Sequence, residues 1–326
     1  MSHIRMAAGL AVGILAVSGC GVAQASTIPP VVQGTPSSLN TRAQWIPAPK
    51  VAQVASHLIA GARHSIRLEM YELGNPTLVQ ALIAAHQRGI SVQVVLDPTE
   101  NQSQQTGPVL ARAGIPVRWM HVPHGIDHVK LLIIDGHEVL TGGVNWGRYS
   151  QWTTDADVLL ASDPLAAQIF QADWQSAGGH PTVDPEGPGG LTGAAIQPAL
   201  DQMIASAHRS IDVAANYLSD WNIQDALIAA HNRGVQVHVL LNKDTPEALS
   251  TERWLVKHGL TVRWATGPYL HAKVLLVDGK TGMLGSANFS YHGMAINHEF
   301  DVSLSNAVLP QAMQWFSGLW TRGRTA

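Results

Sequence analysis

The chain has 326 residues, enough for about two domains. Its hydrophobic content of 46% is ordinary for a packed globular protein and excludes a wholly disordered chain. Charged residues make up 13% and the formal net charge is -3, which excludes a broadly basic nucleic-acid coat. The single cysteine excludes an internal disulfide framework and a multi-cysteine zinc site.

The first 25 residues have the pattern of an export signal. Arg5 precedes an apolar run from Met6 to Val17, which is shorter than the roughly 20 residues of a membrane-spanning helix. The run ends in Val17-Ser18-Gly19-Cys20, which resembles a bacterial lipobox, so we expect cleavage before Cys20 and a lipid on its thiol. Ala23-Gln24-Ala25 instead matches the cleavage site of a freely secreted protein. We therefore predict an exported protein, either a lipoprotein on the outer face of the cell membrane or a secreted one.

A long internal repeat organises the rest of the chain. The segment Ala81–Gly89 recurs almost unchanged as Ala226–Gly234, at an offset of 145 residues. That period is far longer than a solenoid unit, so it indicates a duplicated domain. The predicted organisation is a signal peptide, a flexible spacer, a first domain, a Gly- and Pro-rich linker and a second domain, over residues 1–25, 26–45, 46–175, 176–193 and 194–326.

Each copy shows the same order of expected elements. In copy one these are a helix over 51–62, a strand over 66–71, a helix over 76–88, a strand over 90–96, a helix over 104–113, a strand over 115–119, a hairpin of strands 128–134 and 137–141, and a helix over 164–174. Copy two ends with a helix over 310–320. Alternating strands and helices with a hairpin predict the α/β class, with a mixed β-sheet flanked by helices in each copy.

A second repeated pattern carries residues suited to chemistry. Its six positions have the same spacing in both copies: His128, Lys130, Asp135, Gly142, Gly143 and Asn145, then His271, Lys273, Asp278, Gly285, Ser286 and Asn288. Histidine and lysine two residues apart on a strand lie on one face. Together they suit a phosphate, because the lysine supplies charge and the histidine a nucleophile or proton carrier.

The other positions of the pattern have separate expected roles. Asp135 and Asp278 fall in the hairpin turns and are expected to bond the turn backbone. The glycines, including Gly142 and Gly285, permit close backbone approach. The asparagine side chains can donate an amide hydrogen to a phosphoryl oxygen.

Both stretches resemble the HKD motif of the phospholipase D superfamily, HxKx4Dx6GSxN. Copy two matches every fixed position, whereas copy one has Gly143 in place of the serine. The resemblance covers both halves from about residue 46. It implies two tandem phospholipase D-like domains, related by a pseudo-twofold axis that brings both motifs into one site of a monomer. It also implies that a carboxylate about ten residues past each asparagine, Glu299 and Asp155, orients a catalytic histidine.

The resemblance further implies a two-step displacement at phosphorus without a metal or cofactor. His128 would be the nucleophile that forms a phosphohistidine, and His271 would protonate the leaving alcohol and then activate water. Lys130, Lys273 and the two asparagines would stabilise the charge on the phosphoryl oxygens. The sequence alone leaves the order of the two histidines open.

Several other residues have two interpretations. His121, His124 and His128 have a spacing that suits a metal, but copy two has no equivalent and a polar loop is the alternative. The aromatic residues Trp146, Trp152 and Phe289 follow the motifs and either rim the site or pack the loops. Polar residues near the ends of the first strands either line the cleft or are ordinary surface groups, and these are Glu69, Glu72 and Asn216.

The motif predicts phosphodiester chemistry but not the alcohol groups. We expect a phospholipid substrate, cleaved to phosphatidate and a free headgroup, because a lipid anchor would hold the site at a membrane surface. The alternative is a metal-independent endonuclease on DNA or RNA, favoured by the compact copies and disfavoured by the acidic, lysine-poor composition. A non-catalytic binding protein of the same fold would have lost a histidine or lysine, and both motifs keep theirs.

Overall fold

A computed structural model describes residues 43–177, 190–243, 245–304 and 306–326. The expected signal peptide with Cys20, most of the expected spacer and the centre of the expected linker lie outside these ranges. Within them, no helix has the length and apolar character needed to span a bilayer.

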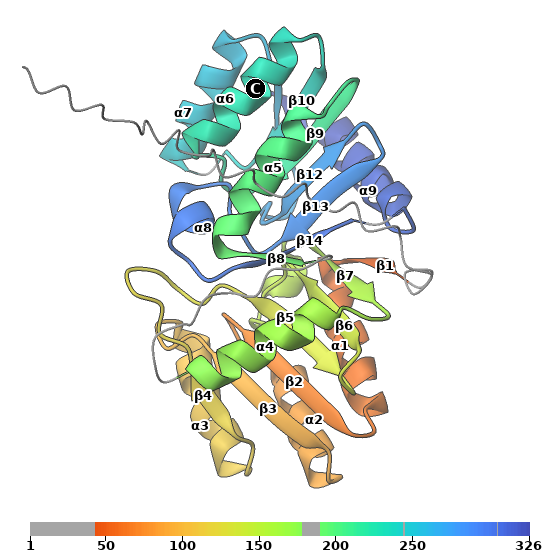
Figure 1. The fold of residues 1–326 in the computed structure, drawn as a ribbon, viewed down its shortest axis with the longest axis vertical. Coiled ribbons are helices and arrows are strands. Elements are labelled where there is room, and N and C mark those ends of the chain that lie inside the picture. Colours follow the sequence, from red (N-terminus) through yellow and green to blue (C-terminus); the bar gives the residue numbers. More distant parts are fainter. Residues whose placement is uncertain (1–42, 178–189, 244, 305) are drawn as a thin grey trace, which may run out of the picture. The chain divides into compact units, whose positions relative to one another are not determined.

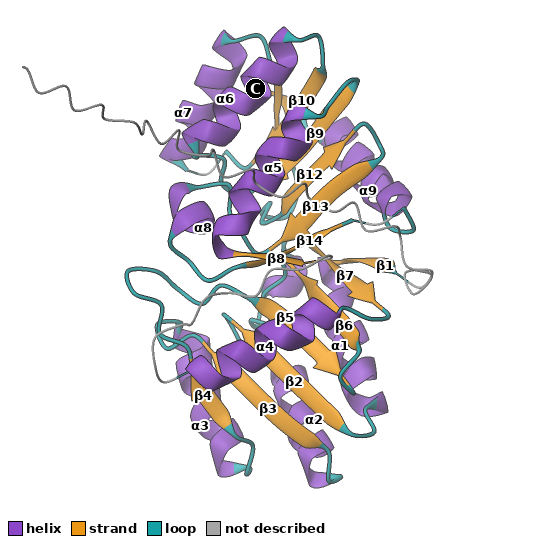
Figure 2. Ribbon diagram, in the orientation of Figure 1, coloured by secondary structure: helices purple, strands orange, loops and turns teal. Residues whose placement is uncertain are grey.

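The first repeat is a seven-stranded mixed sheet with helices on its faces (Figures 1 and 2). The sheet order is β1-β7-β6-β5-β2-β3-β4, with β2, β3 and β4 parallel and the other neighbours antiparallel. The strands are β1 (Gln44–Pro47), β2 (Ser65–Met70), β3 (Ser91–Leu96), β4 (Val117–Trp119), β5 (Lys130–Ile134), β6 (Glu138–Gly142) and β7 (Ala156–Leu160). The helices are α1 (Ala48–Gly61), α2 (Pro76–Gln87), α3 (Asn101–Arg112) and α4 (Pro164–Ser176).

The second repeat has the same plan in an eight-stranded sheet of order β15-β11-β10-β9-β12-β13-β14-β8. Its strands are β8 (Gly190–Thr192), β9 (Ser210–Ala215), β10 (Gln236–Leu241), β11 (Thr261–Trp264), β12 (Lys273–Val277), β13 (Thr281–Gly285), β14 (Phe300–Ser303) and β15 (Arg324–Thr325). Its helices are α5 (Ile196–Ala205), α6 (Trp221–Asn232), α7 (Pro246–Lys257), α8 (Tyr291–Ala295) and α9 (Leu309–Arg322). The predicted α/β class and the two mixed sheets are therefore confirmed.

The structure adds short strands at the sheet edges that the sequence pattern did not predict. β1 begins at Gln44, inside the expected spacer, because Trp45 is buried and the strand pairs with β7. β8 occupies the end of the expected linker and pairs with β14. These strands are too short to show a period of their own, so their pairing depends on the rest of the sheet.

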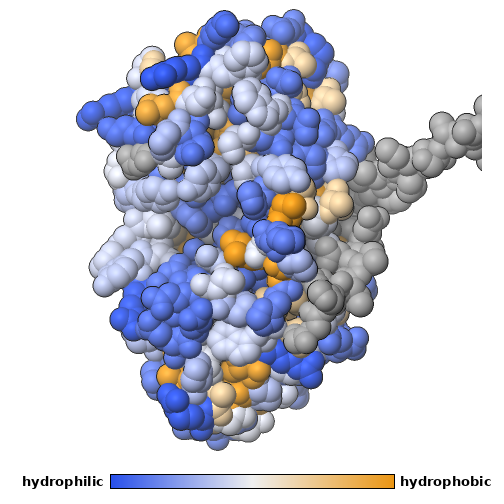
Figure 3. All heavy atoms as spheres, turned by 90° about the vertical axis from the view of Figure 1, so that its left-hand side faces the viewer, coloured by the Kyte–Doolittle hydropathy of each residue, from blue (hydrophilic) through white to orange (hydrophobic). Residues whose placement is uncertain are grey.

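Three apolar clusters hold the fold. One packs α1 and α2 against the first sheet, and another packs α5 and α6 against the second. The third is shared by the repeats: Leu131 and Phe170 of the first repeat belong to the same cluster as Leu276 and Phe316 of the second. Because this shared core joins the two sheets, it fixes the motif-bearing strands β5 and β12 relative to one another. On the face drawn in Figure 3, hydrophobic residues form small separate patches among hydrophilic ones.

The aspartates of the two motifs anchor their hairpins. Asp135 and Asp278 adopt positive φ values of 52° and 55°, and each is followed by a glycine. The Asp135 carboxylate accepts hydrogen bonds from the backbone N–H groups of residues 63–65, and Asp278 does the same with residues 208–210. Their bonds therefore reach beyond the turn itself, to the segment that leads into β2 or β9.

Candidate active site

The two motifs lie at the beginning of equivalent buried strands. β5 starts at Lys130 and β12 at Lys273, so each histidine stands in the extended segment just before its strand. Each lysine folds back so that its Nζ donates to the carbonyl of the histidine two residues earlier, a contact of 2.5 Å between Lys273 and His271. Both ammonium groups are almost fully buried. The alternation along the chain thus places a cation beside each imidazole, as the spacing indicated.

Each motif histidine binds a carboxylate from the other repeat. His128 Nδ1 lies 3.0 and 3.1 Å from the two oxygens of Glu299, and His271 Nδ1 lies 2.8 Å from Asp155 Oδ2. The backbone repeats this exchange, because the His128 N–H donates to His298 O at 2.8 Å and the His271 N–H donates to Thr154 O at 2.9 Å. Both halves of the chain therefore build one set of two histidine–carboxylate pairs.

The two pairs are not equivalent. Glu299 also accepts hydrogen bonds from Ser286 Oγ at 2.6 Å and Asn297 Nδ2 at 3.0 Å. Gly143 stands where repeat two has Ser286, and a Cβ there would lie 2.5 Å from Asp155 Oδ1. The missing serine and the shorter carboxylate therefore fit each other, since Asp155 lies against Gly143.

Close backbone approach accounts for the first glycine of each motif. A Cβ on Gly142 would lie 2.5 Å from Asp157 Oδ1, and one on Gly285 would meet Asp301 in the same way. These two aspartates are fully buried and accept the backbone N–H groups of Val144 and Ala287, each at 3.0 Å. The glycines thus admit a carboxylate that fixes the loop leading to each motif asparagine. Sequence reasoning missed both aspartates, although each follows two residues after a carboxylate that it did single out.

Burial dominates the protonation of the site. It lowers the pKa of His128 to about 4, with Lys130 adding to the effect and Glu299 opposing it. The pKa of His271 is lowered by burial and Lys273, against Asp155. Burial also lowers the pKa of Lys130 to about 7. Burial alone would raise the pKa of Glu299, but His128 and Lys130 hold it at about 2. At neutral pH both imidazoles are therefore neutral, and His128 is bound to an ionised Glu299.

The motif asparagines are half-buried on the loops after β6 and β13. The Oδ1 atoms of Asn145 and Asn288 have no hydrogen-bond partner among the described residues. Glu72 is half-buried in the loop directly after β2, and Asn145 opposes the rise in its pKa that burial causes. Tyr71 packs edge-on against His128 with ring centres 5.0 Å apart, and its ring centre is 5.1 Å from Lys130 Nζ. Sequence reasoning missed Tyr71 because repeat two has Asn216 at the equivalent position.

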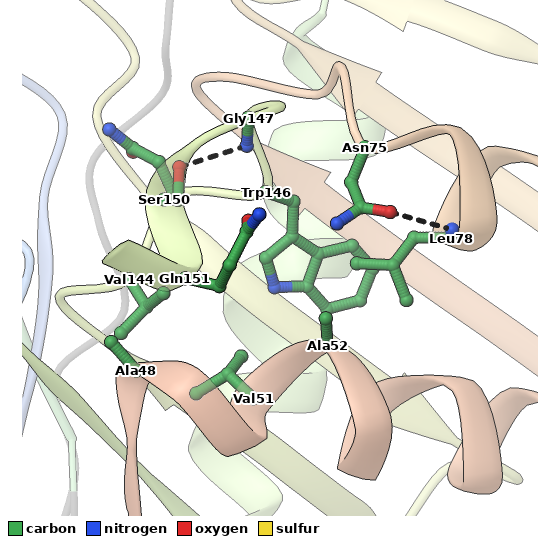
Figure 4. A pocket seen from close by; sticks show the side chains of 11 residues that line it. Ala48, Val51, Ala52, Asn75, Leu78, Val144, Trp146, Gly147, Ser150 and Gln151 are labelled. Carbon is green, nitrogen blue, oxygen red and sulfur yellow. Dashed lines mark hydrogen bonds between the residues drawn. The ribbon is translucent and has the colours of Figure 1, made fainter. Parts of the chain in front are cut away.

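The neighbouring aromatic residues fall into two groups. Trp146 and Phe289 are buried core residues; Figure 4 shows the Trp146 indole above Ala52 and Val51 of α1, beside a cavity of about 10 Å3 that has room for about one water. Trp152 is 65% exposed and stacks on Tyr149, with ring centres 5.5 Å apart. The stacked pair is therefore open to a ligand, whereas Trp146 and Phe289 pack the loops.

The histidine cluster expected as an alternative metal site does not form one. His121 and His124 are exposed, while His128 is buried against Glu299. Among the described residues, the potential ligands that converge are instead Glu69, Asp173 and His298. Glu69 is fully buried, so it does not line the cleft as an exposed polar group would.

This arrangement can perform nucleophilic and acid–base chemistry at phosphorus. A histidine whose Nδ1–H donates to a carboxylate keeps its Nε2 lone pair for attack or proton transfer. Two such histidines with two buried cations provide a nucleophile, a proton carrier and charge stabilisation in one place. An anionic phosphate placed there would also offset the burial of Lys130 and Lys273.

Comparison with known proteins places this site in a family. A family model described as "Cardiolipin synthase, PLD-like domain" matches residues 56–175 and 200–320. The chain is 27% identical over 294 residues to the cardiolipin synthase of Geobacillus kaustophilus (strain HTA426), covering 74% of this chain and 58% of that protein. It is 29% identical over 134 residues to the mitochondrial cardiolipin hydrolase of Xenopus laevis, covering 40% of this chain and 63% of that one. The chain thus spans about half the length of the curated relatives it matches.

A solved structure shares the fold over most of the chain. The phosphatidylserine synthase of Haemophilus influenzae Rd KW20 superposes with a TM-score of 0.69 at 11% identity, covering 87% of each chain. This likeness concerns the fold alone. Because the family model covers both repeats and both motifs, the chain belongs to the phospholipase D superfamily.

Proposed function

We propose that the protein transfers the phosphatidyl group of a phospholipid from its headgroup to an acceptor, through a phosphohistidine. Water as the acceptor gives phosphatidate and a free headgroup, and an alcohol as the acceptor gives a new phospholipid. The observation that carries the proposal is the exchanged pair of histidine–carboxylate contacts, His128 with Glu299 and His271 with Asp155. Support for a lipid substrate comes from the relatives, which include cardiolipin synthases and a cardiolipin hydrolase.

In the first step, His128 Nε2 attacks phosphorus and the bond to the headgroup oxygen breaks. Glu299 accepts the Nδ1–H of His128, so the positive charge that develops on this imidazole is stabilised. His271, held by Asp155, gives a proton to the leaving alcohol. Because burial lowers the pKa of His271, the substrate phosphate must supply the negative charge that favours its protonated form.

In the second step, neutral His271 removes a proton from the acceptor, whose oxygen attacks phosphorus and releases His128. Lys130 and Lys273 stabilise the phosphoryl oxygens in both steps. In this step the catalytic residues treat water and an alcohol in the same way, and the two acceptors differ only in whether they can enter the site. The acceptor is therefore decided by which hydroxyl reaches the phosphohistidine.

The exposed pair Trp152 and Tyr149 favours a membrane surface as the place of this reaction. Both lie on the loop between Asn145 and Asp155, so they flank the residues of the site. Aromatic side chains with a polar edge are enriched where a protein meets the bilayer interface. This placement suits an enzyme that draws a phospholipid from the bilayer.

The test is headgroup release from mixed vesicles of phosphatidylglycerol and phosphatidylcholine, measured with and without added glycerol. We expect release that disappears in His128→Ala, and glycerol is expected to divert phosphatidate into phosphatidylglycerol. A parallel arm offers single-stranded DNA and RNA. Cleavage of nucleic acid with no change in the vesicles would overturn the proposal in favour of a nuclease.

A further inference from the structure

A second group of ionisable side chains is buried behind the His128 half of the site. Glu69 lies in β2, Asp173 in α4 and His298 just before β14, so three distant segments contribute. His298 Nε2 lies 3.2 Å from Asp173 Oδ2 and 3.8 Å from Glu69 Oε1, and one ligand atom of each residue lies within 4.8 Å of the others. Asp127 adds a further carboxylate against Glu69. All four residues are at most 5% exposed.

Several carboxylate oxygens of this group have no hydrogen-bond donor among the described residues. They are both oxygens of Glu69 and Oδ2 of Asp127, whereas Oδ2 of Asp173 faces His298 Nε2 at 3.2 Å. His298 supplies one basic group against three carboxylates. Buried carboxylates need a proton or a cation, since an unpaired buried charge is costly.

The second repeat shows that the fold does not require these charges. Ala214 takes the place of Glu69 at the 145-residue offset, and Leu270 precedes His271 as Asp127 precedes His128. Leu319 precedes Trp320 in α9 as Asp173 precedes Trp174 in α4. All three equivalents are buried in the shared apolar core. The equivalent positions are thus apolar in repeat two, whereas repeat one has acids there that contact His298.

We propose that Glu69, Asp173 and His298 bind a divalent cation, with Zn2+ as the preferred ion. Imidazole nitrogen and carboxylate oxygen are both zinc ligands, and tetrahedral bonds of about 2.0–2.1 Å place ligand atoms about 3.3 Å apart. His298 Nε2 lies 3.2 Å from Asp173 and 3.8 Å from Glu69, and all three ligand atoms lie within 4.8 Å of one another. Asp127 or a water completes the coordination, and the ion adds positive charge beside the buried oxygens of Glu69 and Asp127.

The ion would hold the His128–Glu299 pair in position and would not contact the phosphorus of the substrate. Asp127 and His298 form a parallel backbone bridge between the repeats, and the residues that follow them are His128 and Glu299. A cation bound to His298 would therefore fix the backbone that brings this catalytic pair together. The His271 pair needs no such ion, because its equivalent bridge joins Thr154 to Leu270.

The experiment measures metal on the untagged full-length protein. After incubation with zinc sulfate and desalting, elemental analysis is expected to find about one zinc per chain, and zinc is expected to raise the melting temperature of the stripped protein by about 5 °C or more. Asp173→Asn and Glu69→Gln are each expected to weaken zinc binding at least about tenfold. The matched control is Asp212→Asn, which removes the carboxylate 2.9 Å from His238 in a half-buried pair and should leave zinc binding unchanged.

A second measurement on wild-type protein covers the case that the variants do not fold. Titration with Co2+ is expected to give the visible absorption of a four-coordinate ion, and zinc is expected to remove it. Wild-type protein that shows neither this absorption nor a thermal shift with zinc or manganese would overturn the proposal. So would folded Asp173→Asn and Glu69→Gln proteins that keep the wild-type zinc content. These readouts do not depend on whether the substrate is a lipid.

Discussion

Replacing Glu299 with glutamine should show whether Glu299 sets the tautomer and charge of His128, the proposed nucleophile, or only packs against it. Both oxygens of Glu299 lie within 3.1 Å of His128 Nδ1, so glutamine in either orientation places an amide NH2 against that nitrogen. The amide favours the tautomer with the proton on Nε2, the atom that must attack. It also removes the negative charge that opposes the lowering of the His128 pKa.

The expected loss in kcat is about 10^3- to 10^4-fold, as for comparable histidine–carboxylate pairs. At about 1.4 kcal/mol per factor of ten, this corresponds to roughly 4–5.5 kcal/mol of transition-state stabilisation. The structure supports a value in this range because Glu299 is fully buried and holds three side-chain partners, so water cannot replace it.

The assay is steady-state headgroup release from vesicles, with circular dichroism and thermal melting to check the fold. Asp212→Asn breaks a histidine–carboxylate contact of similar length, 2.9 Å, in a half-buried pair of repeat two and should leave kcat within about twofold. A folded Glu299→Gln protein whose kcat stays within about threefold of wild type would refute the reasoning.

Three further predictions concern pH and the membrane. His271 must carry a proton to act as the acid and its pKa is lowered, and the pKa of Lys130 is lowered to about 7. We therefore expect kcat/KM to fall as pH rises through the neutral range and to fall further above 7; a flat profile up to pH 9.5 would contradict this. Burial raises the pKa of Asp301 to about 7, so the folded state binds the extra proton and loses stability as pH rises from about 4 to 7. Between pH 4 and pH 8, the free energy of unfolding of Asp301→Asn should therefore rise by up to about 4 kcal/mol relative to that of wild type, as measured by denaturant titration. A difference in unfolding free energy that is the same at both pH values would count against this prediction. Trp152→Ala should lower the rate on vesicles several-fold but leave the rate on a dispersed short-chain phospholipid unchanged. The control Leu249→Ala, at a residue of α7 that is 40% exposed, should change neither rate. Equal losses on both substrates in Trp152→Ala would contradict a membrane role for this residue.

Motif spacing in the sequence predicted the contacts that a residue makes within its own strand or hairpin. The repeated His-x-Lys pattern placed each lysine beside its histidine, and Asp-Gly located both hairpins at Asp135 and Asp278. The resemblance to the phospholipase D superfamily also implied Glu299 and Asp155, which contact His128 and His271. The cross-repeat partners could not be assigned from spacing, because they depend on how the shared core aligns the two sheets.

The group of Glu69, Asp173 and His298 was even harder to predict from spacing in the sequence. Glu69, Asp173 and His298 come from positions more than 100 residues apart in each successive pair, so no local pattern connects them. Tyr71 was missed because the repeat comparison offered Asn216 in its place. Departures from the internal repeat, such as Glu69 against Ala214, were visible in the sequence, but only the packing shows that they converge.

We propose that both repeats build one site and that this site forms a phosphohistidine. The most direct test is intact-protein mass spectrometry of His271→Asn after mixing with phosphatidylglycerol vesicles, with quenching at alkaline pH to preserve the adduct. In His271→Asn a mass increase of one phosphatidyl group is expected to appear slowly, because the acid for the leaving alcohol is missing, and then to persist, because the base that activates the acceptor is also missing. No adduct is expected in His128→Asn. An adduct on neither variant, with turnover retained in either one, would contradict this proposal.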